Sequence, residues 1–278
     1  MATVAALLQE GVAQLRESSN SARADVELLL CHLLGKPRSF LFTWPEQALS
    51  ASQVQQFFDW IAQRRDGMPV AYLTGRREFY GHEFLVSQDT LIPRADTETL
   101  VDAVLQRLPE TQPLRVADLG TGTGAIAISL ALARPAWQVE AVDFSVAILD
   151  LVQRNVSRLG ASNVRLLQSN WCARLAGPFD AIVSNPPYIA EDDRHLAQGD
   201  VRFEPRSALT SGIDGLDDIR TIVTQAKGLL ASQGLLALEH GYDQGDAVRE
   251  LLAAQGYVRI ETLRDLNGQD RVTLGHAD

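Results

Sequence analysis

The chain has 278 residues, enough for one large domain or two of moderate size. Hydrophobic residues make up 46% of it, so it can bury a sizeable core, yet no apolar run approaches the ~20 residues of a membrane-spanning helix. The formal net charge of −10 disfavours, without excluding, a protein that binds extended phosphate backbones, which Lys and Arg usually contact.

The first 75 residues predict a small helical bundle. Apolar residues recur at helical spacing in the segments 4–15, 26–34 and 54–61. Gly35 follows the second segment as a helix-ending signal, and Ser50 with Gln53 forms a capping-box pattern ahead of the third. Residues 76–94 then predict a linker with a β-hairpin, because aromatic residues flank a glycine in the run 78–86.

From residue 95 to residue 278 the pattern alternates between helix and strand. The expected strands are residues 115–119, 138–142, 164–168, 179–184, 235–239, 257–263 and 271–274. The expected helices are residues 97–108, 125–133, 146–159, 217–231 and 247–254, with Gly160 and Gly234 ending two of them. This alternation predicts an α/β fold with a seven-stranded, mostly parallel, doubly wound sheet covered by helices on both faces.

A glycine-rich loop, Asp118-Leu119-Gly120-Thr121-Gly122-Thr123-Gly124, joins the first of these strands to the next helix. Its glycines allow a tight turn and a close approach to a ligand, but the G-x-G-x-G spacing differs from the G-x-G-x-x-G typical of dinucleotide sites. Asp118 either fixes a loop amide or meets an ammonium group of the ligand. Asp143 ends the next strand, where a carboxylate can accept both hydroxyls of a ribose. We therefore predict a nucleotide-type cofactor bound by Gly120, Thr121, Gly122, Thr123, Gly124 and Asp143.

The tetrapeptide Asn185-Pro186-Pro187-Tyr188 directly follows the expected strand 179–184. Its prolines lack N–H groups and disfavour helix in the residue before them, so we expect extended backbone with unused carbonyls just past a strand end. Ligands of open parallel sheets bind at that edge. Asn185 offers a side-chain carbonyl and Tyr188 a flat ring, which together can grip a planar –NH2 group. An incidental proline-rich loop is the alternative for the tetrapeptide on its own.

Taken in order, the glycine loop, Asp143 and the tetrapeptide resemble class I S-adenosylmethionine-dependent methyltransferases, which have a Rossmann-like fold, and in particular those that methylate planar amino or amide nitrogens. Further runs resemble one family, the release-factor glutamine methyltransferases. These runs are residues 91–98, 118–124, 183–189, 202–205 with 208–209, and 238–241. The resemblance covers nearly the whole chain. It departs at Ala95, where the family usually has a second proline in Pro-Arg-Pro, and at Gln269 in a surface loop.

The resemblance implies that S-adenosylmethionine is the cofactor and that the acceptor is the glutamine amide in the Gly-Gly-Gln motif of class 1 peptide-chain release factors. Asn185 and the Pro186 carbonyl would accept the amide N–H groups, Tyr188 would stack on the amide plane, and Pro187 would border the substrate. Asn170 and Trp171 would bind adenine, with Asn185 also beside the cofactor. Residues 1–75 would recognise the partner, and residues 95–278 would form the catalytic domain.

Two alternatives remain from the residues alone. One is an enzyme that methylates the exocyclic amine of adenine in DNA or RNA after the base is flipped from its stack. The other is a non-catalytic protein that retains the cofactor fold. The acidic charge balance argues against the first alternative, and the intact glycine loop and tetrapeptide argue against the second.

Other features give weaker expectations. Cys31 and Cys172 lack metal-ligand spacing and the N-terminus lacks a secretory pattern, so we expect a cytoplasmic protein with no metal, no membrane contact and no direct nucleic-acid contact. Three acidic residues are candidates for shaping the pocket: Glu98, Glu204 and Glu239. A basic cluster, either solvated or facing an acidic partner, comprises Arg64, Arg65, Arg76 and Arg77.

Overall fold

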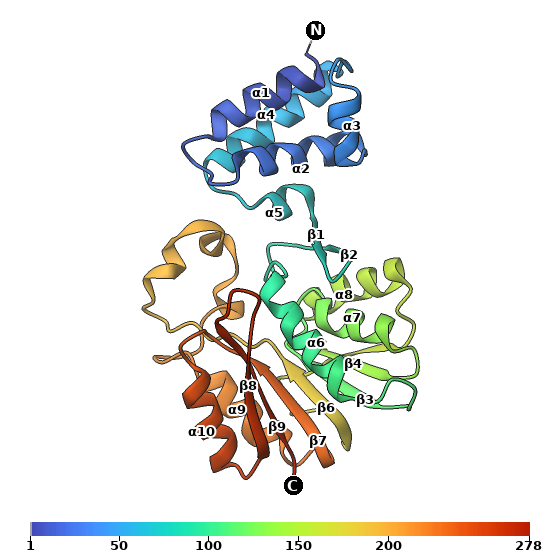
Figure 1. The fold of residues 1–278 in the computed structure, drawn as a ribbon, viewed down its shortest axis with the longest axis vertical. Coiled ribbons are helices and arrows are strands. Elements are labelled where there is room, and N and C mark those ends of the chain that lie inside the picture. The colour runs from blue at the N-terminus through green and yellow to red at the C-terminus, as the bar shows by residue number, and fades with distance from the viewer. Residues whose placement is uncertain (1) are drawn as a thin grey trace. The chain divides into compact units, whose positions relative to one another are not determined.

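The computed structural model describes residues 2–278, which form two compact units. One unit contains the chain up to Arg76 together with His195–Phe203, and the other contains Arg77–Arg194 with Glu204–Asp278. The first unit is helical, whereas the second holds the large sheet (Figure 1). Within residues 2–278, no helix combines the length and the apolar character needed to cross a membrane.

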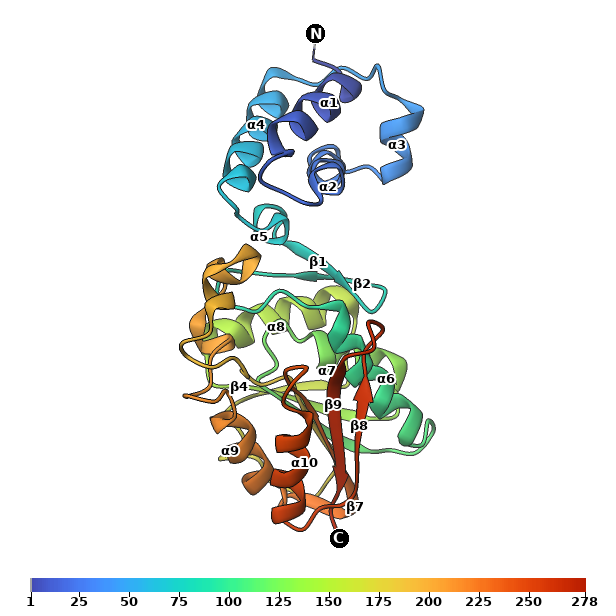
Figure 2. The same ribbon diagram turned by 60° about the vertical axis from the view of Figure 1, so that its left-hand side comes forward.

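The helical unit confirms the predicted bundle. Its α-helices are α1 (Val4–Leu15), α2 (Ala22–Leu34), α3 (Arg38–Thr43), α4 (Ala51–Arg65) and α5 (Val70–Thr74). Helix α1 packs against α2 and α4 around a core that includes Leu29, Phe57 and Ile61 (Figure 2). The capping box is present, because Ser50 Oγ accepts the Gln53 N–H while Gln53 Oε1 accepts the Ser50 N–H. Helices α3 and α5 were not predicted, since they are too short to show a periodic pattern.

Arg64 corrects the interpretation of the basic cluster as a free surface. Its Nε donates to Asp25 Oδ2 at 2.8 Å, and its Nη1 donates to Asp200 Oδ1 at 3.0 Å. The Arg64 side chain is only 12% exposed and Asp25 is buried. In the same unit, Arg202 Nη2 donates to the Asp66 carbonyl at 2.7 Å. These bonds fasten the segment His195–Phe203 to α4, so Arg64 serves an internal ion pair.

The predicted hairpin consists of β1 (Arg76–Phe79) and β2 (His82–Leu85), and all of it except Arg76 belongs to the second unit. It turns through Tyr80 and Gly81, both at positive φ. The large sheet follows. Its strands are β3 (Arg115–Leu119), β4 (Gln138–Asp143), β5 (Val164–Gln168), β6 (Phe179–Ser184), β7 (Leu230–Glu239), β8 (Val258–Arg264) and β9 (Asp270–His276). Their spatial order is β5-β4-β3-β6-β7-β9-β8, with β9 antiparallel to both neighbours and the other pairs parallel. The predicted seven-stranded, mostly parallel sheet is confirmed.

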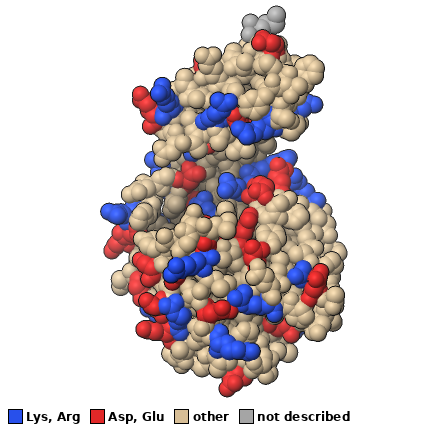
Figure 3. All heavy atoms as spheres, viewed as in Figure 1, with Lys and Arg blue, Asp and Glu red and all other residues tan. Residues whose placement is uncertain are grey.

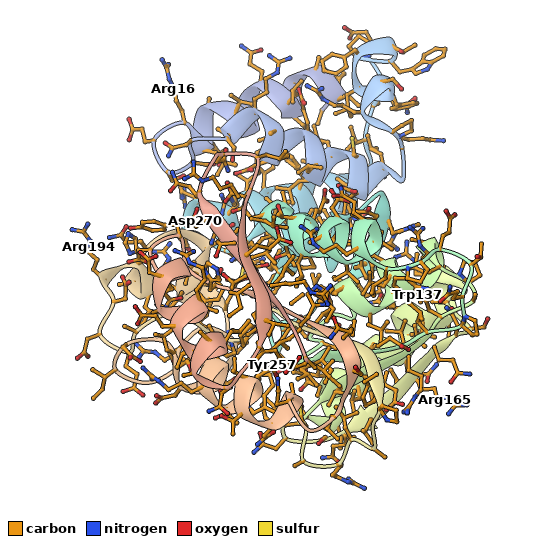
Figure 4. All side chains as sticks on the ribbon, turned by 60° about the horizontal axis from the view of Figure 1, so that its bottom comes forward. Arg16, Trp137, Arg165, Arg194, Tyr257 and Asp270 are labelled. Carbon is orange, nitrogen blue, oxygen red and sulfur yellow. The ribbon has the colours of Figure 1, made fainter. Side chains whose placement is uncertain are left out.

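Helices cover both faces of this sheet (Figure 1). On one face lie α6 (Glu98–Arg107), α7 (Ala125–Ala133) and α8 (Val146–Leu159), and on the other lie α9 (Asp217–Ala226) and α10 (Gly245–Ala254). Each face has its own apolar core, the first including Trp137 and the second Tyr257 (Figure 4). Arg165 extends from the edge strand β5 into solvent (Figure 4). Short 3₁₀ helices complete the chain: η1 (Ala95–Thr97), η2 (Arg194–Ala197), η3 (Gly199–Phe203) and η4 (Arg206–Ala208).

The predicted helix over residues 217–231 is wrong at its C-terminal end. Helix α9 stops at Ala226, and the Phe179 N–H donates to the Leu229 carbonyl at 2.8 Å as β7 begins to pair with β6. Gly234 therefore ends no helix but lies inside β7, where an added Cβ would meet the Phe179 carbonyl oxygen at 3.0 Å. Leu229 and Leu230 continue the helical spacing of Ile219, Ile222 and Val223, but Leu230 is the first residue of β7. Gly160 does end α8, in the left-handed conformation.

Candidate active site

Sheet register brings the predicted site residues together at one edge. Leu119 pairs with Val142 and with Ser184, so the residues that follow them, Gly120, Asp143 and Asn185, emerge side by side. A cavity of about 290 Å³ lies there, near the lower end of the ~300–1,000 Å³ range of small-molecule sites. The predicted residues that line it are Gly120, Thr121, Gly122, Thr123, Asp143, Asn170, Trp171, Asn185 and Pro187. Among residues 2–278, the predicted residues Gly124, Pro186 and Tyr188 lie outside this lining.

The glycine loop has the backbone conformation that its sequence suggests. Gly120, Gly122 and Gly124 all have positive φ, which disfavours any residue with a Cβ. Gly120 also packs against an aromatic ring, because an added Cβ would come within 3.0 Å of Trp171. Gly124 instead precedes α7 and abuts Ile128, so its role in the structure is to let the helix start close to its neighbours.

Two buried carboxylates fix this loop. Asp143 Oδ2 accepts the Gly122 N–H at 3.2 Å, and its Oδ1 accepts the Ser145 N–H at 3.1 Å. Burial raises the pKa of Asp143, and these backbone bonds partly oppose the rise. Asp118 Oδ2 accepts the Thr121 hydroxyl at 2.6 Å and the Ala127 N–H at 3.1 Å, so this oxygen holds the loop to the start of α7.

Asp118 keeps one oxygen without a bond. Its Oδ1 has no hydrogen-bond partner in the described chain, and the side chain is fully buried. Burial raises the pKa of Asp118 to about 7.

Aromatic side chains flank the cavity beyond the loop. Trp171 has a positive φ, and its indole N–H donates to Asp218 Oδ1 at 3.1 Å, which holds the ring over Gly120. Asn170 is exposed at the cavity. Sequence reasoning missed Phe144, which lines the cavity although it is 59% exposed. Its position directly after the acidic strand end was a signal that it lies at the site.

Asn185 is held by a residue from another element. Its Nδ2 donates to the Thr97 hydroxyl at 3.2 Å, and Thr97 lies buried where η1 leads into α6. No hydrogen bond within residues 2–278 uses Asn185 Oδ1 or the Pro186 carbonyl. Thr97 also lines the cavity; it lies in the run 91–98 that resembles the family, but it was not among the predicted site residues. Both expected acceptors are therefore without a partner in the described chain, but only Asn185 lines the cavity, whereas Pro186 is buried outside the lining.

Tyr188 and the three candidate glutamates form bonds around the site. The Tyr188 hydroxyl donates to Glu239 Oε1 at 3.3 Å, and burial raises the pKa of this phenol far above its usual range. Glu98 accepts the Tyr80 N–H at 2.9 Å, and neither residue is among those that line the cavity. Glu204 accepts the Ile92 N–H at 2.9 Å and pairs with Arg94, which lines the cavity.

Glu239 is the most unusual of the three glutamates. It ends β7, is only 1% exposed, and its Oε2 has no hydrogen-bond partner in the described chain. Burial raises the pKa of Glu239 to about 7, while the Thr97 hydroxyl, as a hydrogen-bond donor, and the positive charge of Arg271 oppose that rise.

Comparisons with known proteins show the family of this chain. A family model described as the PrmC N-terminal domain matches residues 6–75, and one described as the methyltransferase small domain matches residues 94–204. A curated protein from Pseudomonas aeruginosa named release factor glutamine methyltransferase is 53% identical over 99% of both chains. Its namesake from Escherichia coli is 50% identical over 96% of both chains.

Solved structures show the shared fold. A 16S rRNA N2 G1207 methyltransferase from T. Thermophilus, in complex with AdoMet and guanosine, is 21% identical with a TM-score of 0.53, covering 73% of this chain and 50% of that one. The fold alone is common to many methyltransferases, whereas the curated relatives match from end to end. The chain therefore belongs to the family of the release factor glutamine methyltransferases.

Proposed function

We propose that this protein transfers the methyl group of S-adenosylmethionine to the side-chain amide nitrogen of the glutamine in the Gly-Gly-Gln motif of class 1 release factors. Family membership supports the reaction. The single observation that carries the assignment is the state of Asn185: its N–H side is bonded to Thr97, and its carbonyl oxygen is left for a ligand in the cavity.

The residues of the cavity suit this cofactor. The Asp143 carboxylate keeps lone pairs for ribose hydroxyls after accepting two backbone N–H groups, and the exposed ring of Phe144 lies next to it. Asn170 and Trp171 border the cavity where an adenine edge and face would be met. When bound, S-adenosylmethionine supplies a methyl group already activated by a positively charged sulfur.

The acceptor end must compensate for a poor nucleophile. The lone pair of an amide nitrogen is delocalised into its carbonyl, so the nitrogen attacks only when it is well aligned. Asn185 Oδ1 and the Pro186 carbonyl would each accept one N–H of the glutamine amide and point the nitrogen toward the methyl group. Both bonds strengthen as positive charge develops on that nitrogen, so they stabilise the transition state more than the ground state. Water takes the amide proton after transfer, and Tyr188 would lie against the amide plane.

Electrostatics favour a protein acceptor over a nucleic acid. The chain has 25 Lys and Arg against 35 Asp and Glu residues, and Figure 3 shows basic and acidic side chains mixed over the face it displays. Sites that follow a phosphate backbone instead use a run of basic groups.

The helical unit would recognise the release factor. Both cysteines are free, in keeping with a reducing cytoplasm.

One transfer experiment tests the proposal. The protein is incubated with S-adenosylmethionine carrying a labelled methyl group and with a release factor, the same factor with its Gly-Gly-Gln glutamine replaced by alanine, or adenine-containing DNA. We expect label only on the unaltered factor. Label on the DNA alone refutes the proposal in favour of base methylation, and binding of cofactor without any transfer favours a non-catalytic protein.

A further inference from the structure

A buried polar chain links the tetrapeptide to the end of β7. Asn185 Nδ2 donates to the Thr97 hydroxyl at 3.2 Å, and the Tyr188 hydroxyl donates to Glu239 Oε1 at 3.3 Å. Hydrogen bonding from Thr97 also lowers the pKa of Glu239, which places these two residues next to each other. These residues come from segments that are far apart in sequence but meet beneath the cavity. Asn185 and Thr97 line the cavity, whereas Glu239 is not among the lining residues.

Proton counting along this chain fixes the orientation of Asn185. A hydroxyl group has a single proton to donate and otherwise acts as an acceptor. If the Thr97 proton points to the ionised Glu239 carboxylate, then Thr97 can only accept a bond from Asn185. The –NH2 side of the Asn185 amide must therefore face Thr97, and its carbonyl must face the cavity. A protonated Glu239 can donate to Thr97 instead, which lets Thr97 donate to the wrong side of the Asn185 amide.

We propose that Thr97 and Glu239 are positioning residues, which make Asn185 present a hydrogen-bond acceptor rather than a donor to the methyl-accepting amide. The inference rests on the proposed function, because only an –NH2 acceptor benefits from a carbonyl at this point. The same carboxylate fixes the ring of Tyr188 through its hydroxyl. One buried anion thus orients both side chains expected to touch the substrate amide.

The surroundings of Glu239 explain why it titrates near neutral pH. Burial favours the protonated form, and the charge of Asp96 acts in the same direction. The Arg271 guanidinium, together with hydrogen bonds from Thr97 and Tyr188, favours the ionised form. Arg271 is itself paired with Asp265 at 3.2 Å, so its charge is shared. Because the positioning role needs the ionised form, turnover should rise as the pH increases through the pKa of Glu239, about 7.

Removing the Thr97 hydroxyl tests the inference. We expect Thr97→Val to lower kcat about 10- to 100-fold, the usual cost of losing a group that orients a functional one, and to leave the Kd for S-adenosylmethionine nearly unchanged. Thr97→Ser retains the hydroxyl and should recover most of the rate. Thr273→Val is the matched control, since it also removes a buried hydroxyl in this unit but one that bonds His240 instead.

A double-mutant cycle distinguishes positioning from a general structural role. In the background of Asn185→Ala, Thr97→Val should cost little further rate, because Thr97 acts through Asn185. Additive losses, or a Thr97→Ser variant as slow as Thr97→Val although folded by circular dichroism, overturn the inference. The wild-type protein must first methylate the release factor, so a failure of the proposed function is seen before any variant is compared.

The pH profile gives a second, independent readout. Glu239→Gln stays neutral at every pH but still offers a carbonyl to Thr97 and Tyr188. We expect its kcat to be lower than that of the wild type at pH 8 and to lose the rise through pH 7. An unchanged pH profile in Glu239→Gln contradicts the assignment of this residue.

Discussion

The two ends of the cavity are built differently. At the cofactor end, backbone N–H groups, glycines at positive φ and Asp143 follow strand ends within short stretches of sequence. At the acceptor end, hydrogen bonds join side chains that are far apart in sequence. Asn185 and Thr97 are 88 residues apart, and Tyr188 and Glu239 are 51 residues apart. Cofactor binding is therefore specified by local strand-turn-helix structure, whereas acceptor alignment is specified by tertiary contacts.

The largest effect should come from the acceptor end. Asn185→Ala removes an acceptor that strengthens in the transition state, so we expect kcat to fall about 10²- to 10³-fold, a loss of about 2.7–4 kcal/mol. The Kd for S-adenosylmethionine, measured by calorimetry, should stay within a few-fold of the wild-type value. A variant that lost cofactor binding but kept its turnover would show that Asn185 belongs to the other end of the cavity.

Asp118 at the cofactor end and Glu239 at the acceptor end should both affect how stability depends on pH, but only Glu239 should affect how kcat depends on pH. Asp118 and Glu239 both have a pKa of about 7 in the folded protein, above the ~4 of unfolded chains. The folded state therefore binds more protons between these values, so the free energy of unfolding should fall as pH rises from about 4 to 7. In urea titrations at pH 5 and pH 8, Asp118→Asn and Glu239→Gln should each reduce this fall.

The pH dependence of kcat distinguishes the roles of these two carboxyl groups. Because Asp118 bonds Thr121 and Ala127 and, within residues 2–278, shares no hydrogen bond with Asn185, Asp118→Asn should leave the rise of kcat through pH 7 in place, whereas Glu239→Gln should remove it. Loss of the rise in Asp118→Asn alone would reverse the assignment of the two carboxyls.

A smaller effect is expected when the glycine loop is altered. Gly120→Ala places a Cβ at a positive φ and 3.0 Å from the Trp171 ring, at a conformational cost of about 1–2 kcal/mol. We expect the Kd for S-adenosylmethionine to rise and kcat at saturating cofactor to change little. Matched measurements on Gly35→Ala, which has positive φ but open space in the helical unit, should show strain without any loss of cofactor affinity.

The smallest effect concerns the loop that carries Thr97. Ala95 begins the 3₁₀ helix η1, Arg94 before it is extended, and no hydrogen bond within residues 2–278 uses the Ala95 N–H. A proline fits this geometry. Ala95→Pro should raise the free energy of unfolding by about 0.4–1 kcal/mol, because the unfolded chain loses freedom. Destabilisation in urea would show that this loop needs the flexibility of alanine.

The sequence predicted the sheet and the cofactor end well, because periodicity, glycines and strand-end acids are local signals. Strands β3, β5 and β6 have the predicted bounds, and Gly120, Asp143 and Asn185 meet as expected. The error at α9 arose because Leu230 begins a strand that is revealed only by its pairing with β6. Thr97 lies in the run 91–98 that resembles the family, but its role had no local signal, since its contact with Asn185 forms only when the chain folds.

A crystal structure with S-adenosylhomocysteine and a Gly-Gly-Gln peptide would show directly whether Asn185 presents its carbonyl oxygen to the glutamine amide. We predict that Asn185 Oδ1 and the Pro186 carbonyl oxygen each lie about 2.7–3.2 Å from the glutamine amide nitrogen, and that Asn185 Nδ2 still donates to the Thr97 hydroxyl. An Asn185 whose –NH2 group instead faces the glutamine carbonyl, with the amide nitrogen bonded elsewhere, would contradict it.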